Sequence, residues 1–250
     1  MSLADSPPEI PILLLGDAGV GKSTFLSYVS HGLHTARHTL LLPSLSPQTL
    51  IVDESRLTLG SSLQTPPNAT LPTLYDLDQP FPFNIRLYNR PYRFEFSDTA
   101  SPTNYTLLKP AVIILCYSIA EPETLHSLHT RWRLIVEKHF NYDESLPVIV
   151  LGLKRDVRAR EEDYDGWVRR REREGGVVGE EGTEVLNGRT FVYPQEGLKV
   201  AQEMRCDRYC ECSAMTGELC REVFEDIAKT AAMTTTEKGG KSQGADCRVM

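Results

Sequence analysis

Three apolar runs mark the most regular part of the chain. They cover residues 10–15, 111–117 and 147–151, and the last two are rich in Val and Ile. Continuous apolar runs of this length are typical of parallel strands that are covered on both faces. The sequence therefore predicts three buried parallel strands.

Helical spacing separates and follows these runs. Between the second and third runs, apolar residues recur at three- and four-residue intervals: Leu125, Leu128, Trp132, Ile135 and Val136. Residues 195–204 and 219–231 are amphipathic in the same way, and the short run 209–212 between them fits a last strand. This alternation predicts an α/β fold with a doubly wound, mostly parallel sheet and with ligands bound at the carboxyl ends of its strands.

A different pattern occupies residues 83–88 and 91–96. Both runs alternate apolar and polar residues, and only Asn89 and Arg90 link them. Alternation with period two across a short polar link predicts a hairpin, which would add an antiparallel edge strand to the sheet. With the runs above, we expect six strands.

The pattern fails in two long segments and at both ends. Residues 32–68 show no sustained period, although 49–52 could form a short strand, and residues 158–188 are densely charged and then glycine-rich. We expect one domain over 9–232 with these two segments as insertions. Residues 1–8 would form an N-terminal extension and 233–250 a polar, disordered tail.

Composition excludes some classes of protein. The net charge of −7 argues against nucleic-acid binding, which relies on Lys and Arg. No apolar run approaches the length that spans a bilayer, and no leader pattern precedes the first strand, so we expect a cytoplasmic chain. Six cysteines form no disulfide-like framework, and reduced, mostly buried thiols are expected.

The sequence Gly16-Asp-Ala-Gly-Val-Gly-Lys22-Ser23-Thr24 directly follows the first apolar run. A strand, a glycine-rich loop and a helix in this order form a phosphate-binding loop, because successive backbone N–H groups can face an anion at the positive end of the helix. Lys22 would reach the β- and γ-phosphates of a nucleotide, and Ser23 would ligate Mg²⁺. The alternative is a glycine turn that binds nothing.

Asp98 ends the second strand of the hairpin. A carboxylate leaving a strand beside a phosphate loop can hold Mg²⁺ through its water shell. An Asp at a strand end is otherwise commonly a cap or turn residue. The interpretation of Asp98 as a magnesium ligand therefore depends on the phosphate loop upstream.

With these motifs, the chain resembles the Ras superfamily of small GTPases. The residues within several of the motifs resemble those of the Rho branch. The resemblance rests on the phosphate loop and on four further segments: 71–76 (switch I), 98–100 (the start of switch II), 153–156 (the guanine motif) and 208–214. It implies the P-loop small-GTPase fold, with helices on both faces of the sheet, and a GTP/GDP-dependent molecular switch in signal transduction. Effectors and regulators would bind near 71–78 and 98–108.

The resemblance also implies roles for single residues. Mg²⁺ would be held by Ser23, Thr73 and Asp98, with Lys22 and Thr73 acting on the γ-phosphate. In the guanine motif, the Lys154 stem would lie along the base and Asp156 would accept from its N–H edge. The expected nucleotide-binding residues are Gly16, Asp17, Ala18, Gly19, Val20, Gly21, Lys22, Ser23, Thr24, Lys154, Asp156, Ser213 and Ala214.

Three residues depart from the family pattern. Ala18 stands where glycine is usual, Leu153 replaces a polar residue, and Pro102 stands at the position of the glutamine that orients the attacking water. Proline has no side-chain amide. We therefore expect guanine-nucleotide binding with slow GTP hydrolysis.

The last four residues, Cys247-Arg-Val-Met250, resemble a prenylation box, with methionine favouring a farnesyl group. A lipid on Cys247 would hold part of the protein at the cytoplasmic face of a membrane. Two alternatives stay open: an interaction module that keeps GTP without hydrolysing it, and an unrelated P-loop ATPase or kinase.

Overall fold

A computed structural model gives the fold and describes residues 7–39, 49–53, 56–57, 80–87, 90–98, 108–140, 146–160 and 191–235. The strands are β1 (Glu9–Leu15), β2 (Thr49–Asp53), β3 (Arg56–Leu57), β4 (Phe81–Leu87), β5 (Arg90–Asp98), β6 (Val112–Ser118), β7 (Val148–Leu153) and β8 (Arg208–Glu211). The helices are α1 (Lys22–Thr39), α2 (Pro122–Ser127), the π-helical turn η3 (Leu128–Trp132), α3 (Arg133–His139), α4 (Asp156–Arg160), α6 (Pro194–Glu203) and α7 (Cys220–Met233).

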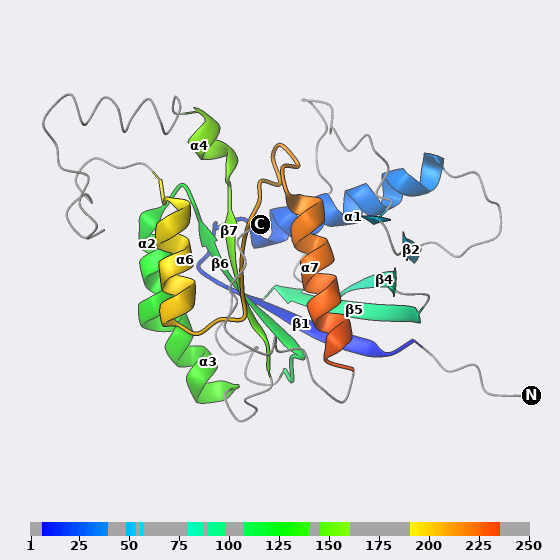
Figure 1. Ribbon diagram of the computed structural model, residues 1–250, viewed down its shortest axis with the longest axis horizontal. Helices are drawn as coiled ribbons and strands as arrows, with labels where there is room; N and C mark the ends of the chain where they lie inside the picture. The colour runs from blue at the N-terminus through cyan, green and yellow to red at the C-terminus, as the bar shows by residue number, and fades with distance from the viewer. Residues whose placement is uncertain are drawn as a thin grey trace, which may run out of the picture.

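The strands form one sheet in the order β3-β2-β4-β5-β1-β6-β7-β8 (Figure 1). Strands β5, β1, β6, β7 and β8 run parallel, and β4 pairs antiparallel with β5. The predicted fold class and its six strands are confirmed. The hairpin was expected to supply the edge strand of the sheet. Instead, β2 pairs parallel with β4 and antiparallel with β3, so β4 is not the outermost strand.

Part of the predicted insertion 32–68 has regular structure. Helix α1 continues to Thr39, and β2 forms where residues 49–52 were expected to make a short strand. Polar and β-branched residues weaken the helical pattern after residue 31, which is why sequence periodicity placed the end of the helix too early. Most of the second predicted insertion lies outside the described residues.

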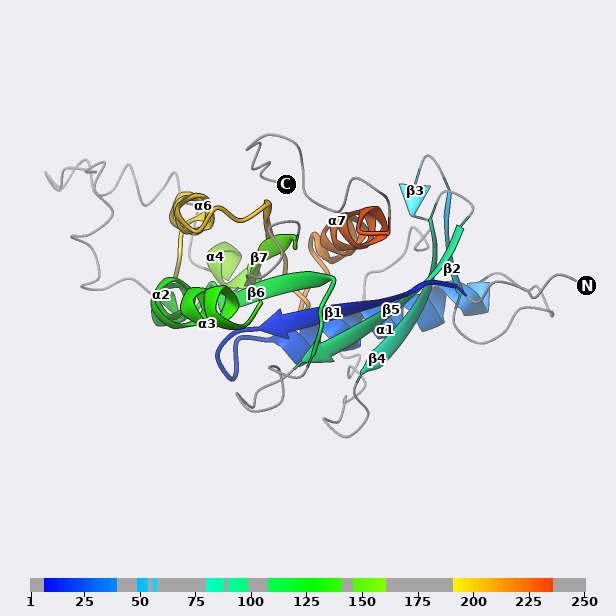
Figure 2. The same ribbon diagram turned by 90° about the horizontal axis from the view of Figure 1, so that it is seen from below.

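Alternating strand residues divide the core into two clusters. In β1, Ile12 and Leu14 face a cluster with α1 and α7, whereas Leu13 and Leu15 face a cluster with α2, η3 and α6. Figures 1 and 2 show α2, α3 and α6 grouped together, apart from α7. Helices therefore cover both faces, as the continuous apolar runs predicted.

Aromatic residues attach α7 to the hairpin. Phe83 and Phe96 meet edge to face with ring centroids 5.1 Å apart, and Phe224 of α7 stacks on Phe96 at 6.1 Å. Burial of such rings contributes heavily to core stability. This packing holds β5, and with it Asp98, against the rest of the sheet.

Candidate functional site

The carboxyl ends of the parallel strands meet at one edge of the sheet. The loop at 16–21 follows β1, Asp98 ends β5, Lys154 follows β7 and Ser213 follows β8 closely. In the register of β1 and β5, Leu14 pairs with Asp98, so Asp98 lies beside the start of the glycine-rich loop. The topology thus brings the predicted phosphate and base motifs to the same edge.

Gly16 opens the loop where the backbone passes close to β6. A Cβ at this position would lie 2.2 Å from the carbonyl oxygen of Cys116, which no side chain can accommodate. The φ of Gly16 is also positive, at 150°. Glycine is therefore required here for both space and conformation.

The loop closes around the ammonium group of Lys22. Its Nζ donates to the carbonyl oxygens of Gly16 and Asp17, both at 3.0 Å, and the side chain is buried. At the crest of the loop, Ala18 and Gly19 are exposed, while Val20 is buried in the core beneath. The loop and Lys22 therefore hold each other in place.

Asp98 connects β5 to this loop. One carboxylate oxygen accepts from Ser23 Oγ at 2.5 Å, and the other lies 3.7 Å from Lys22 Nζ. Asp98 and Lys22 are each only 5% exposed. A hydroxyl and a carboxylate in contact are the donor types that Mg²⁺ prefers, so these two residues fit a magnesium ion.

The residues predicted to bind the base lie just after the carboxyl ends of β7 and β8. Lys154 has a positive φ of 63°, and its Nζ donates to Glu121 at 3.0 Å. Asp156 is 8% exposed and accepts from Ser213 Oγ at 2.6 Å. The two loops are also joined by Arg155 N–H, which donates to the Cys212 carbonyl at 3.2 Å. Ala214 follows in the same loop and is buried.

Leu153 connects the two halves of the site. It is buried at the end of β7, and a Cβ on Gly21 of the phosphate loop would lie 3.7 Å from Leu153 Cβ. The family pattern has a polar side chain at this position. In this protein, apolar packing takes the place of that polar group.

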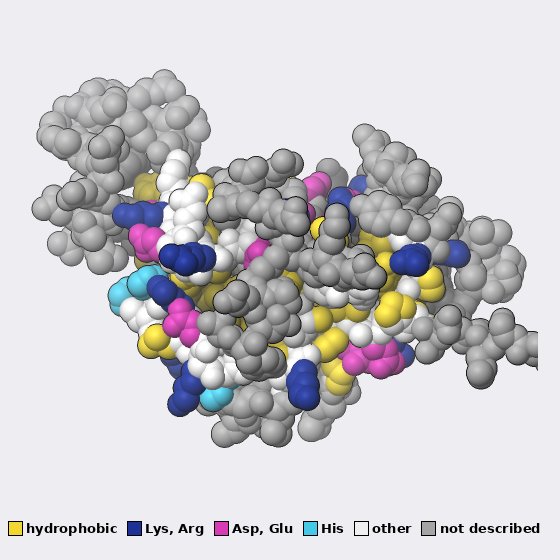
Figure 3. Space-filling model, turned by 60° about the horizontal axis from the view of Figure 1, so that its bottom comes forward, with side chains coloured by type: hydrophobic (Ala, Val, Ile, Leu, Met, Phe, Trp, Pro, Cys, Tyr) yellow, Lys and Arg dark blue, Asp and Glu magenta, His cyan; other side chains and the backbone are white. Residues whose placement is uncertain are grey.

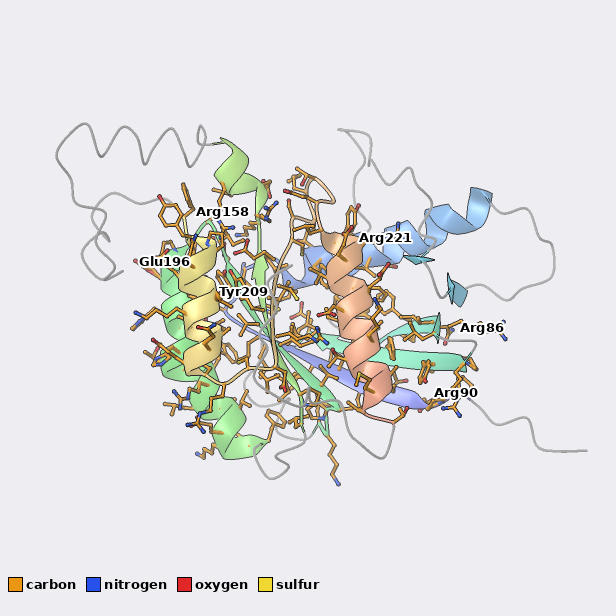
Figure 4. The ribbon with its side chains drawn as sticks, viewed as in Figure 1. Arg86, Arg90, Arg158, Glu196, Tyr209 and Arg221 are labelled. Carbon is orange, nitrogen blue, oxygen red and sulfur yellow. The ribbon has the colours of Figure 1, made fainter. Side chains whose placement is uncertain are left out.

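A buried polar network under the base motif was not found from the sequence. Tyr117 and Tyr209 share a hydrogen bond of 2.8 Å, and Tyr209 donates to Glu211, which also binds Arg158 at 2.8 Å. Burial raises the pKa of both tyrosines, so their hydroxyls keep their protons at alkaline pH values where an exposed tyrosine ionises. Figure 4 shows Arg158 near α4 with Tyr209 beside α6.

Burial alone would lower the pKa of the Arg158 guanidinium. Its hydrogen bonds and charge pairing with Glu211 outweigh burial and raise that pKa. Arg158 Nε also donates to the Val192 carbonyl at 2.7 Å. The network therefore fixes the strands that carry the base motif. No local motif distinguishes these residues from core tyrosines and surface charges in the sequence.

Glu121 and the residues around Asp17 were also missed. Asp17 accepts hydrogen bonds from Ser127 and Trp132, of which the sequence analysis named only Trp132, as a position at helical spacing. Thr73, Pro102, Cys247 and nearly all of the switch segments 71–78 and 98–108 lie outside the described residues. The described part of the chain therefore joins the phosphate loop to Asp98 and Asp156 to Ser213.

One edge of the sheet carries both the phosphate loop with Asp98 and the base motif with Ser213. This arrangement defines a P-loop α/β fold of the small-GTPase type. The sequence profile of the Ras family matches residues 77–233, which is more than half of the chain. The chain belongs to the Ras family. The matched region begins after the phosphate loop, so that motif is independent support.

Similar curated proteins point to the Rho branch. GTP-binding protein RHO3 of Saccharomyces cerevisiae is 24% identical over 256 aligned positions, which cover 100% of this chain and 96% of that protein. GTP-binding protein RHO1 of the same yeast is 25% identical over 71% of this chain and 77% of its own length. RHO1 of Candida albicans is 26% identical over 71% and 80%. The chain is thus a Rho-like small GTPase.

Helices in the described part of the chain are all too short or too polar to cross a membrane.

Proposed function

We propose that this protein is a guanine-nucleotide-dependent molecular switch of the Rho type with slow GTP hydrolysis, built on one domain over 9–232 with a tail at 233–250. Membership of the Ras family supports GTP binding. The observation that carries the proposal is the shared edge, where the Lys22–Asp98–Ser23 cluster lies on one side and the Asp156–Ser213 pair on the other.

On the phosphate side, Lys22 and the backbone N–H groups of residues 16–21 bind the β- and γ-phosphates. Lys22 now donates to two loop carbonyls and would exchange them for phosphate oxygens, which are stronger acceptors. Ser23 and Asp98, with Thr73 from switch I, would hold Mg²⁺. The ion neutralises charge on the phosphates when it is bound.

On the base side, Asp156 reads the N–H edge of guanine. A carboxylate accepts only, and adenine offers no matching pair of donors at that edge. The Ser213 hydroxyl fixes one Asp156 oxygen at 2.6 Å, which sets the direction of the carboxylate. Lys154, held by Glu121, lies along the base, and the backbone N–H of Ala214 serves the guanine oxygen.

Hydrolysis requires a positioned water, and Pro102 cannot position one through a side-chain amide. The methyl group of Ala18, exposed at the crest of the loop, adds bulk where the phosphates bind. The replacement of the glutamine by Pro102 also favours a second candidate function, an interaction module that stays bound to GTP. Effectors and regulators would bind near 71–78 and 98–108 in both cases.

A lipid on Cys247 would bring the protein to a membrane. One isoprenoid chain binds membranes only marginally without a second signal. Intact mass measurement of protein from its own cells tests this part, since farnesylation adds a defined mass to the terminal segment.

Nucleotide specificity tests the function. Chromatography after denaturation should identify copurified GDP or GTP, and mainly GTP would favour the interaction module. In equilibrium binding, the unaltered protein should prefer GTP over ATP by orders of magnitude. Equal binding of the two would overturn the proposal.

The matched variant Asp156→Asn replaces an acceptor oxygen with an N–H donor. It should weaken GTP binding strongly and improve binding of xanthosine triphosphate, whose ring carries oxygen where guanine carries its amino group. The exposed Glu137→Gln, which also exchanges a carboxylate for an amide, is the control and should change neither affinity.

Single-turnover hydrolysis of bound GTP tests the slow rate. The rate should be well below that of ordinary small GTPases. Pro102→Gln should raise it where switch II accepts the longer side chain.

A further inference from the structure

Asp17, the second residue of the phosphate loop, is held from two sides. Its carbonyl accepts from Lys22 Nζ at 3.0 Å inside the loop. Its carboxylate oxygen Oδ1 accepts from Ser127 Oγ at 3.0 Å and from Trp132 Nε1 at 2.9 Å. Both donors belong to the helix that follows β6, so one side chain ties the phosphate loop to that helix.

The π-helical turn η3 explains how both donors reach one atom. Ser127 and Trp132 are five residues apart, and in a regular α-helix such residues point about 140° away from each other. In η3, the N–H of Arg133 bonds to the carbonyl of Leu128, which is an i→i+5 bond. This wider turn brings residues five apart nearer to the same side of the helix.

The donors themselves are firmly placed. Trp132 is only 3% exposed and packs in the core cluster between the sheet and α2, η3 and α6. Arg131 lies over its ring at 5.0 Å and places a guanidinium nitrogen 3.7 Å from Asp17 Oδ1. The indole N–H therefore cannot turn away from Asp17 without moving the core.

The charge of Asp17 makes this arrangement important for an anion site. A carboxylate in a loop that binds phosphates would repel them if it turned toward the ligand. Hydrogen bonds to a charged acceptor are stronger than neutral ones, so two donors and a nearby guanidinium hold the carboxylate on the helix side. The backbone of the loop is then kept in the shape in which its carbonyls surround Lys22.

We propose that Ser127 and Trp132 are positioning residues that prolong the residence of the nucleotide by holding Asp17 away from the phosphates. The inference rests on the proposed function and adds a control point to it. Neither residue belongs to the predicted nucleotide-binding set. Loss of either donor weakens the hold on the Asp17 carboxylate and loosens the loop, so release of the nucleotide becomes faster while the chemistry of the base site is unchanged.

Arg131 contributes less to this control. Its side chain is 56% exposed, so solvent and salt screen its attraction to Asp17. Figure 3 shows that histidine, Lys and Arg side chains gather at the side of the molecule where α2 and α3 lie. Arg131→Gln should therefore change release only slightly, and only at low salt.

The test measures release of a fluorescent GDP analogue from the full chain in Mg²⁺ and excess GDP. Ser127→Ala and Trp132→Phe should each raise the release rate about three- to ten-fold, with the association rate unchanged. Ser127→Ala removes one partly buried hydroxyl, so its thermal midpoint should stay close to that of the unaltered protein. Trp132→Phe keeps an aromatic ring, smaller than the indole, in the core and removes the donor. Arg133→Gln, which breaks an exposed ion pair with Glu137 on the same helix, is the control and should change nothing.

A double-mutant cycle separates positioning from a general loss of structure. Asp17→Ala removes the repelling charge but also the tie between the loop and the helix, so the looser loop should raise the release rate. Adding Ser127→Ala to it should have less than about a two-fold further effect, because the acceptor is already gone. Equal release from all variants that bind the analogue would overturn this inference and leave the proposed function intact. Additive effects in the cycle would overturn it too. Failure of the unaltered protein to bind the analogue would instead overturn the proposed function, and this inference with it.

Discussion

The phosphate half and the base half of the site are stabilised in different ways. In the phosphate half, side chains bind the loop itself, since Lys22 donates to Gly16 and Asp17 and Ser23 donates to Asp98. In the base half, Asp156, which is proposed to read the base, accepts a hydrogen bond from Ser213, and the strands next to it rest on buried packing and on the Tyr209–Glu211 network.

This difference shows where the sequence can change without loss of the site. The phosphate half depends on residues that contact one another, so few substitutions fit. The base half depends on the buried side chains packed beneath its loops. One of them, Leu153, stands where the family pattern has a polar residue and packs against Gly21. We therefore expect substitutions in the phosphate half to have the larger effects.

Removing Lys22 should have the largest effect. Lys22→Ala takes away the cation at the phosphates and also the ammonium group that lies 3.7 Å from buried Asp98. Truncating one member of a buried charge pair costs about 2–5 kcal/mol, so GTP affinity should fall by about a hundred-fold or more. Isothermal titration measures it. Lys229→Ala, an exposed lysine on α7, is the control, and a loss below ten-fold for Lys22→Ala would contradict the assigned role.

Ser213→Ala tests the base half directly. It removes the hydroxyl that donates to Asp156 at 2.6 Å, and a hydrogen bond to a charged group is worth about 1.5–3 kcal/mol. GTP should bind about ten-fold more weakly, and the preference over ATP should narrow. The neighbouring Met215 is 69% exposed, so Met215→Ala controls for changes in the loop. Unchanged specificity in Ser213→Ala would mean that Asp156 is oriented by other groups.

Leu153→Asn restores the polar residue of the family pattern and should have a smaller effect on binding. The amide would be buried beside Gly21 in a site that now packs leucine, and burying an unpaired polar group costs about 1–3 kcal/mol of unfolding free energy. Urea denaturation measures this loss, with the volume-conserving Leu153→Met as control. We expect GTP affinity to stay within about three-fold. A ten-fold gain would show that packing at this position limits binding.

The smallest expected effect at neutral pH is a pH dependence of stability that both halves share. Burial, opposed by Lys22, raises the pKa of the Cys116 thiol from 9.0 to about 12, and burial also raises the pKa of Cys212. The unfolded thiols lose protons near pH 9 while the folded ones keep them. Each thiol therefore stabilises the fold below pH 9, and this contribution is lost as the pH rises above it, by at most about 1.4 kcal/mol per pH unit.

Urea denaturation between pH 8 and 10.5 should show the unfolding free energy falling in the unaltered protein. Cys116→Ala, under the phosphate loop, and Cys212→Ala, beside the base loop, should each reduce the slope while lowering stability at pH 8. If neither variant changes the slope of unfolding free energy against pH, the loss of stability at alkaline pH would be assigned to the buried tyrosines, whose pKa is also raised.

Local sequence patterns predicted most of the strands and the phosphate loop. The alternation before and after residue 89 identified the hairpin of β4 and β5, and the apolar runs identified β1, β6 and β7. The phosphate loop was found because its chemistry needs glycines and a lysine at fixed spacing in the chain. Its partner Asp98 was found because it ends a strand.

Contacts between distant segments could not be predicted in this way. Helical spacing looks the same whether a turn is α or π, so no sequence pattern indicates that Ser127 and Trp132 point toward the same side of the helix. Tyr117 and Tyr209 are 92 residues apart, and only the sheet order brings their hydroxyls together. The roles of Thr73 and Pro102 stay predictions, because both lie outside the described residues.

The hydrogen bond from Arg158 to the Val192 carbonyl has a consequence for how this protein can be modified. It joins the two ends of the segment between them, and Arg158 is itself anchored in the core through Glu211. Added length between two joined points of a chain costs little, since each doubling adds only about 0.6 kcal/mol of closure entropy. The segment is therefore a natural insertion point for a reporter domain, which could be accepted there without disturbing the base motif that begins five residues before Arg158.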